Sequence, residues 1–237
     1  MSIGSIISDA LAYPFQNVKA LVLYLILALI AALIGGSALI GFIGAYHSTG
    51  FSSVAFAGMS LIGIIIFVLV YFLIEGYGLD VVKYGIERRS DSPGIDMGRQ
   101  ISNAIKLVVV TIVYFIIPVI ITFVLGLFLR NWLVSIIALI LFIVFALANF
   151  MAKCRLAKTD DLGAALAIGE AIGDISRVGF VKILGVAAIV VIILLIISII
   201  IVLLNKLNTT LASIILAIAS VYFVLFYNRA VGLLYSD

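Results

Sequence analysis

The chain has 237 residues, of which 66% are hydrophobic and only 11% are charged. Soluble domains carry about 25% charged residues, so this composition excludes a soluble globular protein. A β-barrel is excluded as well, because the apolar runs are continuous over twenty residues or more, whereas barrel strands alternate over about ten. We therefore expect an all-α polytopic membrane protein, organised as a single domain over residues 1–237.

Charge and cysteine content narrow the function classes. The net charge of +3 comes from basic residues at the ends of apolar runs, which does not indicate a nucleic-acid partner. Cys154 and His47 are the single cysteine and the single histidine, so neither an internal disulfide nor a dedicated Cys/His metal site is expected. The chain contains no phosphate-cradling glycine loop with lysine, no HExxH and no GxSxG. We expect no catalytic residues, no metal, no cofactor and no enzyme activity.

Six apolar runs predict six transmembrane helices. Residues 1–16 come first and are amphipathic, with apolar residues at helical spacing, and Pro14 is expected to end this short helix. The predicted spans are 18–43, 54–74, 107–129, 132–152, 183–204 and 211–225.

The distribution of Lys and Arg predicts the orientation. Twelve basic residues fall on the side of the two termini, and only Arg130 and Lys206 fall on the other side. The positive-inside rule then predicts that both termini and the connectors 75–106 and 153–182 are cytoplasmic, in a multi-pass protein of the plasma membrane.

A weak repeat links the three pairs of spans. An amphipathic segment precedes each odd-numbered span, and Lys19, Lys106 and Lys182 stand at matching places. This pattern predicts three hairpins, each preceded by an interfacial helix, at about 2–12, 95–105 and 161–177. The alternative is that any chain of hairpins needs polar connectors with a basic residue at the boundary.

Four residues are candidates for a functional or gating role. Glu75 is an acid within an apolar helix, a costly position that often marks a functional site, although a place near the cytoplasmic interface also explains it. Gly35 and Gly36 indicate close helix packing or a kink in the first span. Pro118 predicts a kink in the third span and is a possible hinge.

Three segments resemble a known family. They are DALAYPFQNVKALV, EGYGLDVVKYGIER and SNAIKLVVVTIVYFIIP, and they are similar to the family catalogued as domain of unknown function 4013. Its members are multi-pass membrane proteins, mainly archaeal, with no assigned activity, so the resemblance implies a membrane location and a helix arrangement alone. The segment SDSPGIDMGRQ departs from the tryptophan- and proline-rich acidic patch of many members. The motif residues are Tyr13, Pro14, Asn17, Lys19, Gly76, Tyr77 and Lys106.

Two functions fit these observations. The first is a non-enzymatic membrane protein that organises lipid, or an unidentified membrane protein partner, at the cytoplasmic face. Nearly all polar and amphipathic segments fall on that side, and the glycine-rich first span also allows a homo-oligomer. The second is a transporter of a small solute or lipid, for which a water-accessible cavity reaching mid-membrane would be the sign.

Overall fold

The computed structural model confirms an all-α fold. It describes residues 1–47 and 51–236, and the surroundings of residues 32 and 35–60 lie outside this description. Over the described part of the chain there is no strand, and the helices are α1 (Ile3–Gln16), α2 (Val18–His47), α3 (Phe51–Ile86), α4 (Met97–Gly126), α5 (Asn131–Thr159), α6 (Leu162–Leu166), α7 (Ile168–Val178), α8 (Phe180–Leu207) and α9 (Thr209–Tyr235).

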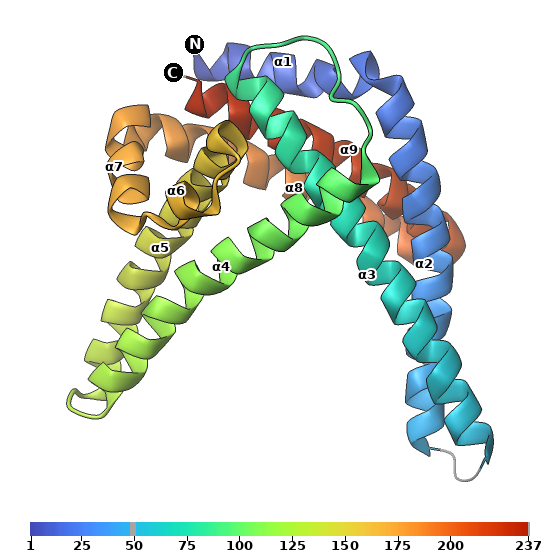
Figure 1. Ribbon diagram of the computed structural model, residues 1–237. Coiled ribbons are helices and arrows are strands. Elements are labelled where there is room, and N and C mark those ends of the chain that lie inside the picture. Colours follow the sequence, from blue (N-terminus) through green and yellow to red (C-terminus); the bar gives the residue numbers. More distant parts are fainter. Residues whose placement is uncertain (48–50, 237) are drawn as a thin grey trace.

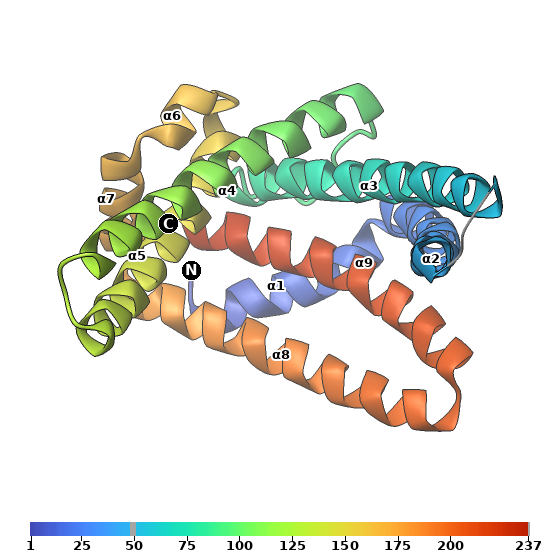
Figure 2. The ribbon, with the colours of Figure 1, turned by 90° about the horizontal axis from the view of Figure 1, so that it is seen from below.

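Three helical hairpins diverge from one end of the molecule. The pairs α2/α3 and α4/α5 spread apart in Figure 1, and Figure 2 shows α8/α9 as the third pair. Both termini, α1, α6 and α7 lie at the end where the hairpins converge, which we call the polar end. The long helices α3 and α9 contact each other and link the hairpins there.

Five described helices are long and apolar enough to cross a bilayer, and a sixth follows if the bent pair α1 and α2 forms one span. This agrees with the polytopic architecture expected from the sequence. Five of the six predicted spans lie within one long helix each, and the third, 107–129, runs three residues beyond the end of α4 at Gly126. Except for α2, which begins with its predicted span at Val18, these helices extend beyond the spans at the polar end.

Two of these extensions shorten the first connector. Helix α3 continues to Ile86, and α4 begins at Met97, where the Asp96 carboxylate accepts from the Arg99 backbone N–H as an N-cap. The separate helix predicted for 95–105 is wrong, because those residues form the first turns of α4. Its polar residues Gln100 and Asn103 are buried against neighbouring helices, while the apolar Met97 and Ile105 stay 55% and 51% exposed.

The other two short segments also differ from expectation. Pro14 does not end the first helix, since α1 continues to Gln16 and Pro14 is buried within it. Asn17 follows, and the axis turns by 74° between α1 and Val18–Ala31. The segment 161–177 forms two helices, α6 and α7, with Ala167 between them.

Glycines allow close helix packing at the polar end. A Cβ on Gly76 would stand 1.8 Å from the backbone oxygen of Gln100, so α3 and α4 touch backbone to backbone. A Cβ on Gly232 would lie 2.3 Å from the carbonyl oxygen of Val82 and 2.8 Å from the α-carbon of Gly85, so α3 and α9 also approach closely. The helices of three hairpins are thus locked together at this end.

Candidate functional site

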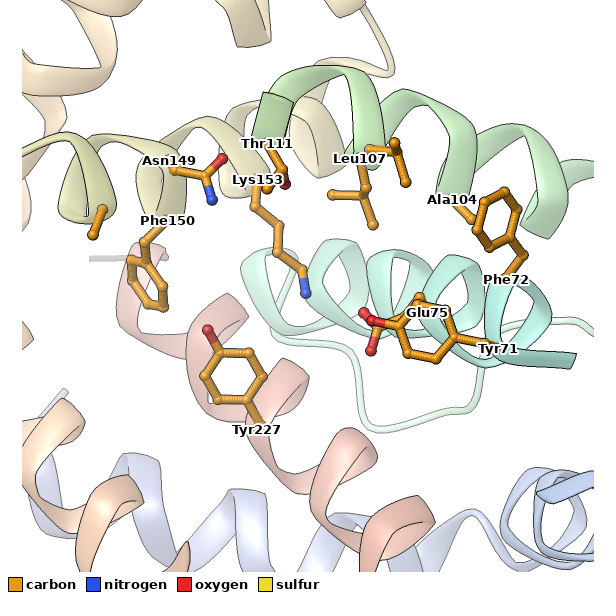
Figure 3. Close-up of a pocket in the computed structure, with 12 residues that line it drawn as sticks. Tyr71, Phe72, Glu75, Ala104, Leu107, Thr111, Asn149, Phe150, Lys153 and Tyr227 are labelled. Carbon is orange, nitrogen blue, oxygen red and sulfur yellow. The ribbon is translucent and has the colours of Figure 1, made fainter. Parts of the chain in front are cut away.

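A cavity of about 370 Å³ lies where α3, α4, α5 and α9 meet. Its size falls in the range of small-molecule sites. Figure 3 shows Glu75 from α3 and Lys153 from α5 reaching into the same space, with Tyr227 of α9 beneath the lysine. The full lining is Tyr71, Phe72, Glu75, Ala104, Leu107, Val108, Thr111, Ala146, Asn149, Phe150, Lys153 and Tyr227.

The helix geometry brings Glu75 and Lys153 to the same depth. Lys153 stands 22 residues after the first residue of α5, which corresponds to a rise of about 33 Å. Glu75 stands 24 residues into α3, or about 36 Å. Hydrocarbon is about 30 Å thick, so both charges lie near the limit of a span on the side of the polar end.

Neither charge has an ionic partner within the described part of the chain. The Lys153 ammonium lies 5.4 Å from the centroid of the Tyr227 ring, and no hydrogen bond or ion pair ties it or Glu75 to another described residue. Lys83, two turns beyond Glu75, lines a different pocket with Asp80 and Arg99. Glu75 and Lys153 attract each other across the cavity, but no ion pair joins them, so each charge keeps room for a ligand group of the opposite sign.

An apolar groove shares one lining residue, Tyr71, with this cavity. It has a volume of about 520 Å³ and lies between α2, α3 and α9. Tyr71 lines both spaces, and the remaining lining is Ala28, Ala31, Phe67, Val70, Ile74, Ser213, Leu216, Ala217 and Ser220. A polar compartment and an apolar one thus adjoin along α3 and α9.

Other charged residues at the polar end form ion pairs with each other, in contrast to Glu75 and Lys153. The Arg229 guanidinium is 3% exposed, donates to Asp9 at 2.7 Å and also donates to the backbone oxygen of Arg89 at 2.6 Å. Asp80 accepts from Arg99 at 3.0 Å and from the Asn103 amide at 3.1 Å. These groups tie α1, α3, α4 and α9 together and have a structural role.

Asp174 of α7 forms a second buried cluster. Its carboxylate accepts from the Tyr235 hydroxyl at 2.6 Å, from Arg177 at 3.1 Å and from Arg155 at 3.2 Å, and Arg155 also pairs with Glu170. Burial alone would raise the pKa of Asp174, but these three donors outweigh it and hold the pKa below its usual value. Asp174 therefore docks α7 against α5 and α9.

The four candidate residues do not converge. Glu75 lines the cavity, whereas Pro118 is buried elsewhere within α4, which continues through it. The Thr122 hydroxyl donates to the backbone oxygen of Pro118, one turn away. Gly35 and Gly36 lie in α2, and their surroundings are outside the described residues. Among the described residues there is also no group of three or more potential metal ligands.

The motif residues have structural positions at the polar end. Tyr13 is fully buried, and the Arg229 guanidinium carbon lies over the Tyr13 ring, 4.8 Å from the ring centroid. Asn17 donates through its side chain to the Tyr13 carbonyl, and Tyr77 donates to the Pro93 carbonyl at 3.3 Å. Lys106 binds Asp160 at 2.6 Å. Lys19 lines a small polar recess beside Tyr77, and Pro14 and Gly76 pack as described above.

Sequence reasoning missed Lys153 and Tyr227 as site residues. In the sequence Lys153 indicates only the orientation of the span, as one of the basic residues on the side of the termini. Tyr227 lies 74 positions further along the chain, so no local pattern connects it with Lys153. One usable signal existed, because Glu75 and Lys153 are charges of opposite sign just inside the same ends of two apolar helices.

The comparisons place the chain in a family. A family model described as "Protein of unknown function (DUF4013)" matches residues 61–206, which is more than half of the chain. The chain belongs to this family. The matched range includes Glu75, Lys153 and three of the four helices that line the cavity, while Tyr227 lies beyond it. The comparison with curated proteins gives no match, and neither does the comparison with solved structures.

Proposed function

We propose that this membrane protein binds one membrane lipid, with the polar head in the cavity at Glu75 and Lys153 and an acyl chain in the adjoining groove. The observation that carries this proposal is that Tyr71 lines both the charged cavity and the apolar groove, so the two compartments are neighbours. A lipid is the molecule whose two parts match those two compartments.

The depth of the cavity supports the same assignment. Glu75 and Lys153 lie near the end of the hydrocarbon region on the side of the polar end, where a head group resides. The protein would sit in the plasma membrane with both termini in the cytoplasm, so that the lipid comes from the inner leaflet. Binding without chemical conversion fits the absence of a catalytic motif from the sequence, and we propose no enzyme activity.

Translocation of a solute is the weaker alternative. A solute path needs polar groups that continue from the cavity toward the far end of the hairpins. Beyond Tyr71 the groove offers Ser213 and Ser220 as its polar side chains, and otherwise carbon. The lining suits an acyl chain better than a hydrated solute.

Lipid retention tests the proposal. The full chain is extracted with a mild detergent, passed over a sizing column, and the co-eluting lipid is quantified by mass spectrometry. We expect about one phospholipid per chain. Ser220→Trp should lower this amount about tenfold, because the indole fills the groove beside Tyr71.

Ile218→Trp is the matched control. Ile218 is exposed on the same helix and does not line the groove, so retention should stay at the wild-type level. The proposal fails if the wild-type chain retains no lipid, if Ser220→Trp retains as much as wild type, or if a stoichiometric protein co-elutes in place of lipid.

A further inference from the structure

The two charges in the cavity narrow the class of head group. Glu75 and Lys153 are partly buried, come from different helices and have no ionic partner among the described residues. Elsewhere at the polar end the buried acids Asp80 and Asp174 are paired with arginines. Glu75 attracts Lys153 across the cavity without forming an ion pair, so the chain itself meets these two electrostatic requirements of opposite sign only in part.

A ligand with charge of only one sign pairs with only one of the two cavity charges. An anionic head group would pair with Lys153 but would be repelled by Glu75, and a cationic one would meet the reverse situation. A charge held away from water without a partner is costly, so the best ligand supplies both partners at once. Such a ligand is zwitterionic.

Resting on the proposed function, we infer that the lipid carries a phosphate together with a primary ammonium, as in a phosphoethanolamine head group. The phosphate pairs with the Lys153 ammonium on the side of Asn149 and Tyr227, and the primary ammonium donates to the Glu75 carboxylate. The adjoining positions of these side chains are visible in Figure 3.

The aromatic lining favours a primary ammonium over a quaternary one. A quaternary ammonium is held by the faces of several aromatic rings and donates no hydrogen bond. Here one face of Tyr227 is covered by the Lys153 ammonium, and the carboxylate of Glu75 is an acceptor for charged N–H donors. Hydrogen-bonding capacity at Glu75 would go unused by a choline head.

The test is a competition between head groups. The full chain, stripped of lipid in detergent, is mixed with equal amounts of phosphatidylethanolamine, phosphatidylglycerol and phosphatidylcholine that share the same acyl chains. Excess lipid is removed on a sizing column, and the bound lipids are counted. We expect phosphatidylethanolamine to be enriched about tenfold over each of the others.

Two substitutions assign the preference to the two charges. Glu75→Gln should abolish the enrichment over phosphatidylglycerol, because the negative charge that repels an anionic head and attracts the ammonium is lost, although the amide oxygen remains an acceptor. Lys153→Met should lower retention of all three lipids about tenfold. Lys158→Met, on the exposed part of the same helix, should change neither ratio nor amount.

The wild-type competition decides the inference even if a variant does not fold. Equal retention of the ethanolamine and glycerol lipids, or of the ethanolamine and choline lipids, overturns the head-group assignment but leaves lipid binding in place. No retention of any lipid overturns the proposed function. Soluble phosphoethanolamine should not displace the lipid at equal concentration, since it lacks chains for the groove, and displacement would show that the ligand is a soluble metabolite.

Discussion

The polar end and the diverging hairpins follow different packing rules. At the polar end, large side chains such as Met151 are fully buried and charges are paired across helices. On the same helix α5, three turns toward the hairpin tip, Leu139 is 63% exposed. The apolar residues of the hairpins face lipid, which offers no hydrophobic force to bring helices together. Association between hairpins therefore depends on the polar end, where backbone contact and ion pairs are concentrated.

The largest loss of stability is expected from separating the backbones of α3 and α4 at the polar end. Gly76→Ala places a methyl group 1.8 Å from the backbone oxygen of Gln100, so α3 and α4 must move apart. We expect a loss of about 3 kcal/mol or more in stability, read as a fall in the thermal midpoint in detergent. Gly173→Ala has open space around its Cβ within α7 and should be neutral or slightly stabilising. Equal midpoints for the two variants would contradict the packing described for α3 and α4.

A second test removes a buried cation. Arg229→Met leaves the Asp9 carboxylate and the backbone oxygens of Tyr84 and Arg89 without their donor. Because Asp9 is 41% exposed in its side chain, water recovers part of the loss, and we expect about 3 kcal/mol, the lower limit for a broken buried pair. The comparison variant is Arg130→Met at the α4/α5 turn, which should shift the midpoint by less than about 0.5 kcal/mol. A similar loss in both variants would show that charge alone, and not burial, determines the effect.

The contrast along α5 gives a third test. Met151→Ala removes a fully buried side chain and should cost about 2 kcal/mol. Leu139→Ala removes a side chain that faces lipid and should cost less than about 0.5 kcal/mol. Thermal unfolding of both proteins in the same detergent measures the difference. If Leu139→Ala proved the more damaging, the hairpin tips would pack more tightly than the structure indicates.

The smallest expected effect depends on pH. The folded pKa of Asp174 is lower than its unfolded value of about 3.9, so its contribution to stability is fully present above that pH and disappears as the pH falls through the folded pKa. Asp174→Asn should cost about 1 kcal/mol at pH 7, since the carboxylate accepts from Tyr235, Arg155 and Arg177. Midpoints measured from pH 7 to pH 3 should show the two proteins converging only below about pH 4. A difference that is constant across this range would contradict the assignment.

The sequence was sufficient for the helices because hydrophobic length alone predicts a span. It was insufficient for the polar end, where tertiary contacts decide the structure. Pro14 would end an isolated helix, yet it is buried within α1. Residues 95–105 have an amphipathic pattern whose apolar residues Met97 and Ile105 stay exposed, while the polar Gln100 and Asn103 bond to Tyr24 and Asp80. The pattern separates the two faces but does not show that the polar face is the buried one.

The candidate site shows the same limit. Glu75 was identifiable because an acid in an apolar run is rare. Its counterpart Lys153 lies 78 positions later at the end of another span, where a basic residue already has an explanation. Only the approach of α3, α5 and α9 distinguishes a lysine that marks orientation from one that lines a cavity.

The bond between Asp9 and Arg229 joins residues 220 positions apart. During synthesis the ribosome makes α9 after the other helices that α9 contacts. Asp9 of α1 therefore has no Arg229 to pair with until α9 has been made. Until then α3 presents its glycine face with no neighbour from the third hairpin. The contacts that join the three hairpins are therefore completed only once α9 has inserted.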